Sequence, residues 1–109
     1  MSRIIPILFL ALLLTNGCEH KEKVNQDRYK QMVSYRNLGL AYMEEERYSE
    51  AANEFIMLVE IAPKEPLGYA NLGLTYMRMS GELDQSEEWL QKALKVAPDD
   101  PDIRLLLAK

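Results

Sequence analysis

The sequence predicts an all-α fold, a short α-solenoid of helix-turn-helix hairpins that stack side by side. A motif, Tyr-x-x-Leu-Gly-x-x-Tyr, occupies residues 35–42 and recurs at residues 69–76, a shift of 34 residues. A set of apolar positions after each motif recurs at nearly the same shift. Apolar residues follow helical spacing throughout, and no segment alternates as a strand would. Self-similarity at this period is typical of stacked helical repeats.

The motif itself predicts the first helix of each hairpin. Leu38 and Tyr42 lie four residues apart, as do their counterparts in the second copy, so each pair shares one helix face. The intervening glycines, Gly39 and Gly73, remove a side chain where the second helix of the pair must approach closely. We expect first helices at about residues 27–45 and 66–79.

The second helix of each hairpin follows from the recurring apolar set, which is shifted by 35 residues. Its members are Ala51, Phe55, Leu58 and Pro63, and then Ser86, Leu90, Ala93 and Pro98. The i, i+4, i+7 spacing gives an inward stripe, and each proline ends its helix. We expect these helices at about residues 49–61 and 84–96. The extra residue falls within Met79–Glu82, where it lengthens the turn between the helices.

Three local signals mark helix starts. Pro66 and Pro101 sit where a fixed φ suits the first helical turn, so a fifth helix begins at Pro101. Asp100 is a good N-cap for that helix. The segment Asp84–Glu87 has the pattern of a capping box, with Asp in the Ser/Thr role.

The two units resemble the tetratricopeptide repeat. Tyr35 and Tyr69 stand where Trp is commonest in that family, and Ser86 and Leu90 replace its Ala and aromatic residue, which are mild departures. The resemblance implies a right-handed α-solenoid over residues 27–109, with repeats at about 32–65 and 66–100 and a partial third at 101–109. It also implies that the first helices line a concave groove that binds a protein ligand.

Transferring the groove positions of the family by motif gives ten candidate partner-binding residues. They are Val33, Arg36, Leu40, Met43, Glu44, Leu67, Ala70, Leu74, Met77 and Arg78. Most are apolar, and Met adapts to varied apolar ligands. We expect an apolar or amphipathic protein segment as the ligand, with Arg36, Glu44 and Arg78 as polar contacts. Alternatively, a third repeat or a C-terminal helix fills the groove, and these residues are core.

The first 17 residues read as an export signal. Arg3 precedes an apolar run, Ile4–Leu14, broken only by Pro6. Eleven such residues would rise only about 16 Å as a helix, well short of the ~30 Å hydrocarbon layer of a bilayer. The segment therefore reads as a signal peptide and not as a membrane span.

The end of this signal resembles the lipobox of bacterial lipoproteins. Gly17-Cys18 fits it, whereas Thr15 and Asn16 depart from the preferred upstream residues. The resemblance implies cleavage before Cys18, acylation of that residue with chains such as palmitate, and a polar tether over residues 18–26. Glu19 after the cysteine implies the periplasmic face of the outer membrane. Alternatively, Cys18 is an incidental thiol after an ordinary secretory signal or an uncleaved anchor.

The composition disfavours nucleic acid as a partner. The chain has 13 basic and 17 acidic residues, a formal charge of −4, and its basic residues are dispersed. A nucleic-acid interface needs clustered Lys and Arg on one face. The acidic runs Glu44–Glu46 and Asp99–Asp102 read as solvated helix ends and turns.

No catalytic or metal-binding pattern is present in the sequence. His20 is the only histidine and Cys18 the only cysteine, and no HExxH, CxxC or Gly-rich phosphate loop occurs. We therefore expect a protein that is not an enzyme and needs no cofactor. A single cysteine also excludes a disulfide within the chain.

The apolar C-terminal segment leaves three alternatives open. Ile103 and Leu105–Ala108 are too apolar for a capping helix, whose outer face should be polar. The chain could be the front of a longer repeat protein, self-associate through this helix, or cap one neighbouring helix. The sequence favours a membrane-anchored scaffold that holds a partner protein in an envelope assembly. The alternative is the N-terminal module of a longer exported enzyme or sensor.

Overall fold

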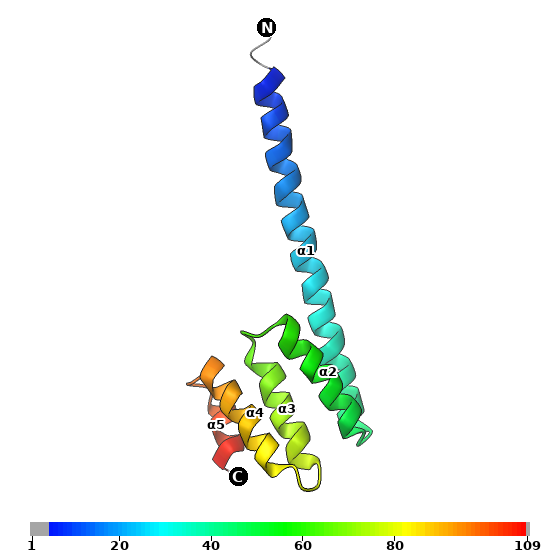
Figure 1. The fold of residues 1–109 in the computed structure, drawn as a ribbon, viewed down its shortest axis with the longest axis vertical. Coiled ribbons are helices and arrows are strands. Elements are labelled where there is room, and N and C mark those ends of the chain that lie inside the picture. Colours follow the sequence, from blue (N-terminus) through cyan, green and yellow to red (C-terminus); the bar gives the residue numbers. More distant parts are fainter. Residues whose placement is uncertain (1–4, 109) are drawn as a thin grey trace. The chain divides into compact units, whose positions relative to one another are not determined.

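The computed structural model describes the backbone of residues 5–108 and the side chains of residues 18–108, and it divides into two compact units, Met1–Lys30 and Gln31–Lys109. The described residues form five α-helices and no strand, which confirms the predicted all-α class (Figure 1). The helices are α1 (Ile5–Glu44), α2 (Tyr48–Ile61), α3 (Pro66–Arg78), α4 (Leu83–Val96) and α5 (Pro101–Ala108).

Helix α1 begins much earlier than predicted, at Ile5 instead of near Asp27. Residues 18–38 contain no glycine or proline and are rich in Glu, Lys, Gln and Arg, which favour helix. Glu19 and Lys23 add a favourable i, i+4 pair of opposite charges. The segment 18–26, expected as a tether, is therefore helical, and all its side chains are exposed.

The predicted signal peptide, residues 1–17, lies outside the residues whose side chains the structure describes. Among the helices of the described residues, none has both the length and the apolar character needed to cross a membrane.

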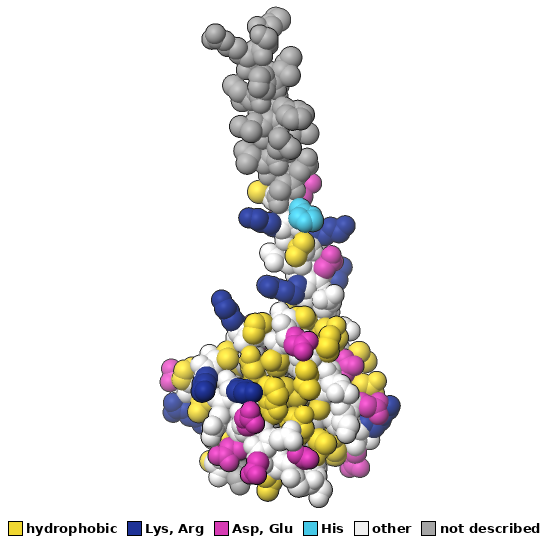
Figure 2. Space-filling model, in the orientation of Figure 1, with side chains coloured by type: hydrophobic (Ala, Val, Ile, Leu, Met, Phe, Trp, Pro, Cys, Tyr) yellow, Lys and Arg dark blue, Asp and Glu magenta, His cyan; other side chains and the backbone are white. Residues whose placement is uncertain are grey.

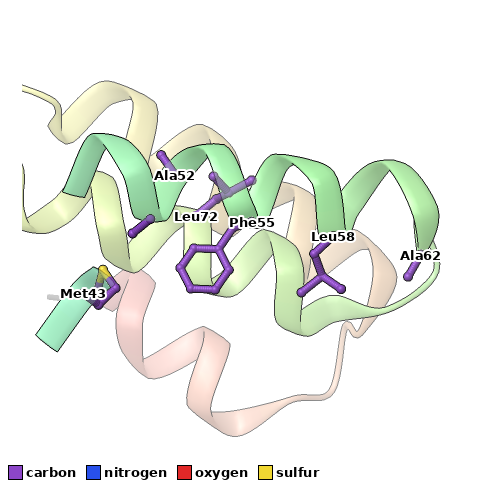
Figure 3. Close-up of a cluster of buried hydrophobic side chains, with 7 residues drawn as sticks. Met43, Ala52, Phe55, Leu58, Ala62 and Leu72 are labelled. Atoms are coloured by element: carbon purple, nitrogen blue, oxygen red, sulfur yellow. The ribbon is translucent and has the colours of Figure 1, made fainter. Parts of the chain in front are cut away.

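The second unit consists of two helical hairpins and a further helix. Helix α3 packs against α2 on one side and α4 on the other, and α5 packs against α4. The core lies between the hairpins, where Phe55 and Leu72 are fully buried (Figure 3). Burial of such side chains stabilises the fold by about 1.5–3 kcal/mol each. The buried cluster comprises Met43, Ala51, Ala52, Phe55, Leu58, Ala62 and Leu72.

Both motif glycines lie where the helices of a hairpin approach most closely. A Cβ atom added to Gly39 would lie 2.6 Å from Cζ of Phe55, and one added to Gly73 would lie 2.5 Å from Cγ of Leu90. These separations are too short for any real side chain. The two repeats thus use the same contact, as predicted, because the absence of a side chain admits the large residue of the second helix.

The turns after the second helices are also equivalent in the two repeats. Ala62 N–H donates to the carbonyl of Leu58, and Ala97 N–H donates to the carbonyl of Ala93, both at 2.9 Å. A proline follows each of these residues. Since proline disfavours a helical conformation at the residue before it, each second helix ends at the same motif position.

The turns inside the hairpins differ in length, as predicted. Glu45–Arg47 joins α1 to α2, whereas Met79–Glu82 joins α3 to α4 and is one residue longer. Both use a left-handed backbone conformation, at Glu46 (φ 60°) and at Gly81 (φ 83°). Glycine adopts that conformation without steric cost, so the longer turn is the less strained.

Arg47 holds the shorter turn together. Its guanidinium pairs with the carboxylates of Glu50 and Glu45 and stacks over the Tyr42 ring, 4.7 Å from the ring centroid. The hydrogen bonds that Arg47 donates to Glu50, and secondly to Glu45, raise the pKa of Arg47 above its ordinary value. The group is exposed, so solvent screens these pairs and their contribution to stability is small.

One predicted cap is confirmed. The Asp100 carboxylate accepts hydrogen bonds from the backbone N–H groups of Asp102 (2.9 Å) and Ile103 (3.2 Å) at the start of α5. This is the interaction that makes Asp a favoured N-cap, because the first N–H groups of a helix have no partner within it.

The predicted capping box at Asp84 is wrong. Helix α4 begins one residue earlier, at Leu83, with Glu82 at the N-cap and no side-chain cap bond. The carbonyl of Glu82 accepts the Ser86 N–H at 3.0 Å, which places Asp84 inside the first turn. Its carboxylate can still favour the positive end of the helix dipole.

We predict that Gly39→Ala lowers the free energy of unfolding by about 1–3 kcal/mol, because the added methyl group displaces the buried Phe55 ring. The better helix propensity of Ala offsets only part of this cost. Urea unfolding of the full chain, followed by circular dichroism, measures the change. Asn37→Ala is the control: this exposed site on the same helix should be neutral or slightly stabilised. Equal effects at both sites would contradict the close-approach argument.

Candidate functional site

A buried contact brings the first helices of the two repeats together. The Thr75 hydroxyl of α3 donates to the carbonyl oxygen of Asn71 at 2.6 Å and lies 3.1 Å from Sδ of Met43 in α1. Thr75 is fully buried and Met43 is 6% exposed. Helices α1 and α3 meet here, and we call the predicted groove residues of these two helices that stay at least partly accessible the first-helix face: Val33, Arg36, Leu40, Glu44, Leu67, Ala70, Leu74, Met77 and Arg78.

Met43 is therefore not an accessible groove residue, which corrects the sequence-based prediction. It belongs to the buried cluster with Phe55 and Leu72. Met77, at the same position of the second repeat, is half-buried. The difference arises because Met43 is covered by the following repeat, a neighbour that the motif alone does not describe.

The other predicted groove residues remain at least partly accessible. Leu40 and Leu67 are 43% and 53% exposed. The charged residues Arg36, Glu44 and Arg78 are exposed. The half-buried members are Val33, Ala70, Leu74 and Met77. Among these, Leu74 packs against the buried cluster, so it contributes to the fold as well as to the face.

Two buried hydroxyls were missed by the sequence reasoning, and both serve packing. The Ser86 hydroxyl donates to the carbonyl of Gly73 at 2.7 Å. Ser86 occupies the motif position of Ala51. Because Gly73 lets the two helices approach closely, its carbonyl lies within hydrogen-bonding distance of the Ser86 hydroxyl. Thr75 is the second case. No buried side-chain polar atom among the described residues lacks a hydrogen-bond partner. Neither hydroxyl is therefore left free for a ligand.

An aromatic pair lies on α3 and α4. The Tyr69 and Trp89 rings are 6.2 Å apart between centroids, and the Lys92 ammonium lies 4.2 Å from the Trp89 centroid. The Tyr69 hydroxyl donates to the carbonyl of Pro63 at 3.0 Å. These contacts bind the α3–α4 hairpin to the preceding turn. Figure 2 shows hydrophobic side chains gathered over α3 and its neighbours on the face in view.

The side chains with reactive groups do not converge. Cys18 is an exposed free thiol and His20 is exposed on the same polar stretch of α1. Among the described residues, no group of three or more His, Cys, Asp or Glu side chains could hold a metal ion. On the first-helix face, the exposed parts of Leu40 and Leu67 offer a ligand apolar surface.

The family comparison agrees with this geometry. The family model for the tetratricopeptide repeat matches residues 42–109, more than half of the chain, and the chain belongs to this family. The matched region begins at the last tyrosine of the first motif and includes α2 through α5. Tetratricopeptide repeats are in general protein–protein interaction modules and typically non-catalytic scaffolds. No curated protein matches the chain.

The paired methionines allow a direct test of their different environments. We predict that Met43→Ala lowers the free energy of unfolding by about 2–4 kcal/mol, since a buried side chain leaves a cavity. The matched control, Met77→Ala, should cost less than half as much because that side chain is half-buried. Chemical denaturation of the two variants measures both values. Similar losses would show that Met77 is as enclosed as Met43.

Proposed function

We propose that this protein holds a partner protein on its first-helix face while acyl chains on Cys18 anchor it in a bacterial cell envelope. The observation that carries the proposal is the pair of exposed leucines, Leu40 and Leu67, on the two helices that line the ligand groove in this family. The exposed part of each leucine side chain contributes nothing to the fold by burial, but it stabilises a complex when a ligand covers it.

The chemistry of the face indicates an apolar or amphipathic partner segment. Burial of a fully exposed leucine side chain contributes about 1.5–3 kcal/mol, and about half of each side chain is still exposed here, so covering Leu40 and Leu67 together would contribute about 1.5–3 kcal/mol. Arg36, Glu44 and Arg78 are exposed around them. Charged groups at the rim of an interface select among partners and orient them more than they add affinity.

The exposed Cys18 supports the anchor. Its thiol is accessible, and the side chains of residues 18–30 that follow are all exposed. Two or more acyl chains, each contributing about 0.8 kcal/mol per buried CH₂, would hold a protein at a bilayer essentially permanently. Glu19 after the cysteine favours the periplasmic face of the outer membrane. A scaffold anchored there would hold its partner within an envelope assembly.

For the anchor, we expect that metabolic labelling with palmitate marks the wild-type protein and is absent from Cys18→Ser. The serine variant keeps the size of the side chain but removes the sulfur that accepts the lipid. After cell fractionation, the variant should be absent from the membrane pellet. Labelling that survives Cys18→Ser would refute this lipidation site, whatever the outcome for partner binding.

For the face, we expect Leu40→Asp/Leu67→Asp to abolish recovery of the partner by photo-crosslinking and affinity purification from native envelopes. Both positions are exposed, so the helical circular dichroism signal should persist. The matched control is Met57→Asp/Val96→Asp, which changes two exposed apolar residues on second helices and should retain binding. If the first variant binds as well as wild type, the first-helix face is not the partner site.

A further inference from the structure

Apolar contacts join the two second helices, α2 and α4, across α3. The Val59 side chain of α2 lies against Gly68 of α3, since a Cβ atom added to that glycine would lie 2.9 Å from Cγ2 of Val59. The next residue, Tyr69, has its ring 6.2 Å from the Trp89 ring of α4. A line of apolar contacts therefore crosses three helices.

The side chains along this line are partly open to solvent. Val59 and Trp89 are half-buried and pack against the buried cluster, as does Ile56, three residues before Val59. Val96 is 36% exposed and follows Trp89 by seven residues, about two helical turns, so the two share one face of α4. We call this set the second-helix patch, and its members are Ile56, Val59, Tyr69, Trp89 and Val96. Tryptophan is enriched among the residues that contribute most to protein interfaces.

A cation already lies on the aromatic ring of this patch. Lys92 places its ammonium 4.2 Å from the Trp89 ring centroid and 3.4 Å from a carboxylate oxygen of Glu88. The Lys92 and Glu88 side chains are 43% and 66% exposed, so both contacts are weak. Arginine stacks on aromatic rings through its planar guanidinium and is less strongly hydrated than an ammonium. An arginine from a partner can therefore take the place of Lys92.

Carboxylates border the patch on both second helices. Helix α2 has three acidic residues and no basic one, and Glu60 lies four residues after Ile56, on the same side of the helix. Glu60 is exposed and, among the described residues, forms no ion pair. On α4, displacement of Lys92 would free Glu88, and the other cation of that helix, Lys95, is exposed. The patch thus complements a ligand whose basic residues point toward Glu60 and Glu88.

We propose that the second-helix patch docks a basic amphipathic segment of a partner protein, with an arginine over Trp89 in place of Lys92 and an apolar residue against Ile56 and Val59. No residue of the patch belongs to the first-helix face. This contact is therefore separate from the one in the proposed function and goes beyond it.

The experiment uses the fluorescence of Trp89, the only tryptophan of the chain. The probes are two short helix-forming peptides, one of alanine, leucine and arginine, and one in which glutamate replaces every arginine. Neither peptide contains an aromatic residue, so any change in tryptophan emission comes from the protein. Titration of the full-length chain with the arginine peptide should give a saturable change, at an affinity at least about tenfold tighter than for the glutamate peptide.

Three variants locate the bound arginine peptide. Lys92→Gln removes the competing cation and should tighten binding by about two- to fivefold. Glu60→Lys should weaken binding by at least about threefold, because it places a like charge at the edge of the patch. The matched control, Glu44→Lys, makes the same charge change at an exposed residue of the first-helix face and should leave the affinity within about twofold of wild type.

Four outcomes would overturn the proposal. They are no saturable change in emission, equal affinity for the two peptides, weaker binding in Lys92→Gln, and an equal loss in Glu60→Lys and Glu44→Lys. A change in emission with protein concentration and no peptide would also overturn it, because the occupant would then be a second copy. The crosslinking experiment with Leu40→Asp/Leu67→Asp alters no residue of the patch, so failure here leaves the proposed function standing.

Discussion

The close approach of the two helices in each hairpin is the constraint on which the rest of the structure depends. Gly39 admits the ring of Phe55, and Gly73 admits the side chain of Leu90, at separations that no side chain on the glycines would permit. This contact sets the distance between paired helices, and that distance lets Leu72 of the next hairpin enter a fully buried position. The stacking of repeats, and hence the first-helix face, follows from it.

Because the repeats stack, residues at equivalent motif positions differ in how far they are buried. Leu72 is fully buried between hairpins, whereas its motif equivalent Leu38 is 44% exposed because it belongs to the first hairpin of the second unit. Met43 of the first repeat is buried, whereas its motif equivalent Met77 is half-buried, since the second hairpin covers Met43. A repeat cannot bury its apolar face alone.

Much of the fold could be predicted because its signals are local. Apolar spacing and the prolines placed α2 through α5 to within a residue or two, and the turn between α3 and α4 has the expected extra residue. The start of α1 could not be predicted in the same way. Residues 18–26 are strong helix formers, but they are also polar enough to suit a tether without regular structure. The prediction of an N-cap at Asp84 was wrong because the helix already begins at Leu83, where the carbonyl of Glu82 accepts the Ser86 N–H.

The sequence by itself determined the hairpins, since helix period, breakers and motif glycines act between residues close along the chain. Through its resemblance to the family, it also predicted that the first helices carry a ligand-binding face, and this stays a prediction. Only the tertiary structure decided which residues of that face remain accessible. Met43 is buried while Leu40 and Leu67 are exposed, because solvent access depends on which neighbouring helix covers each position. Thr75 and Ser86 show the same limit, since each buried hydroxyl is satisfied only by the geometry of helix packing and its local backbone.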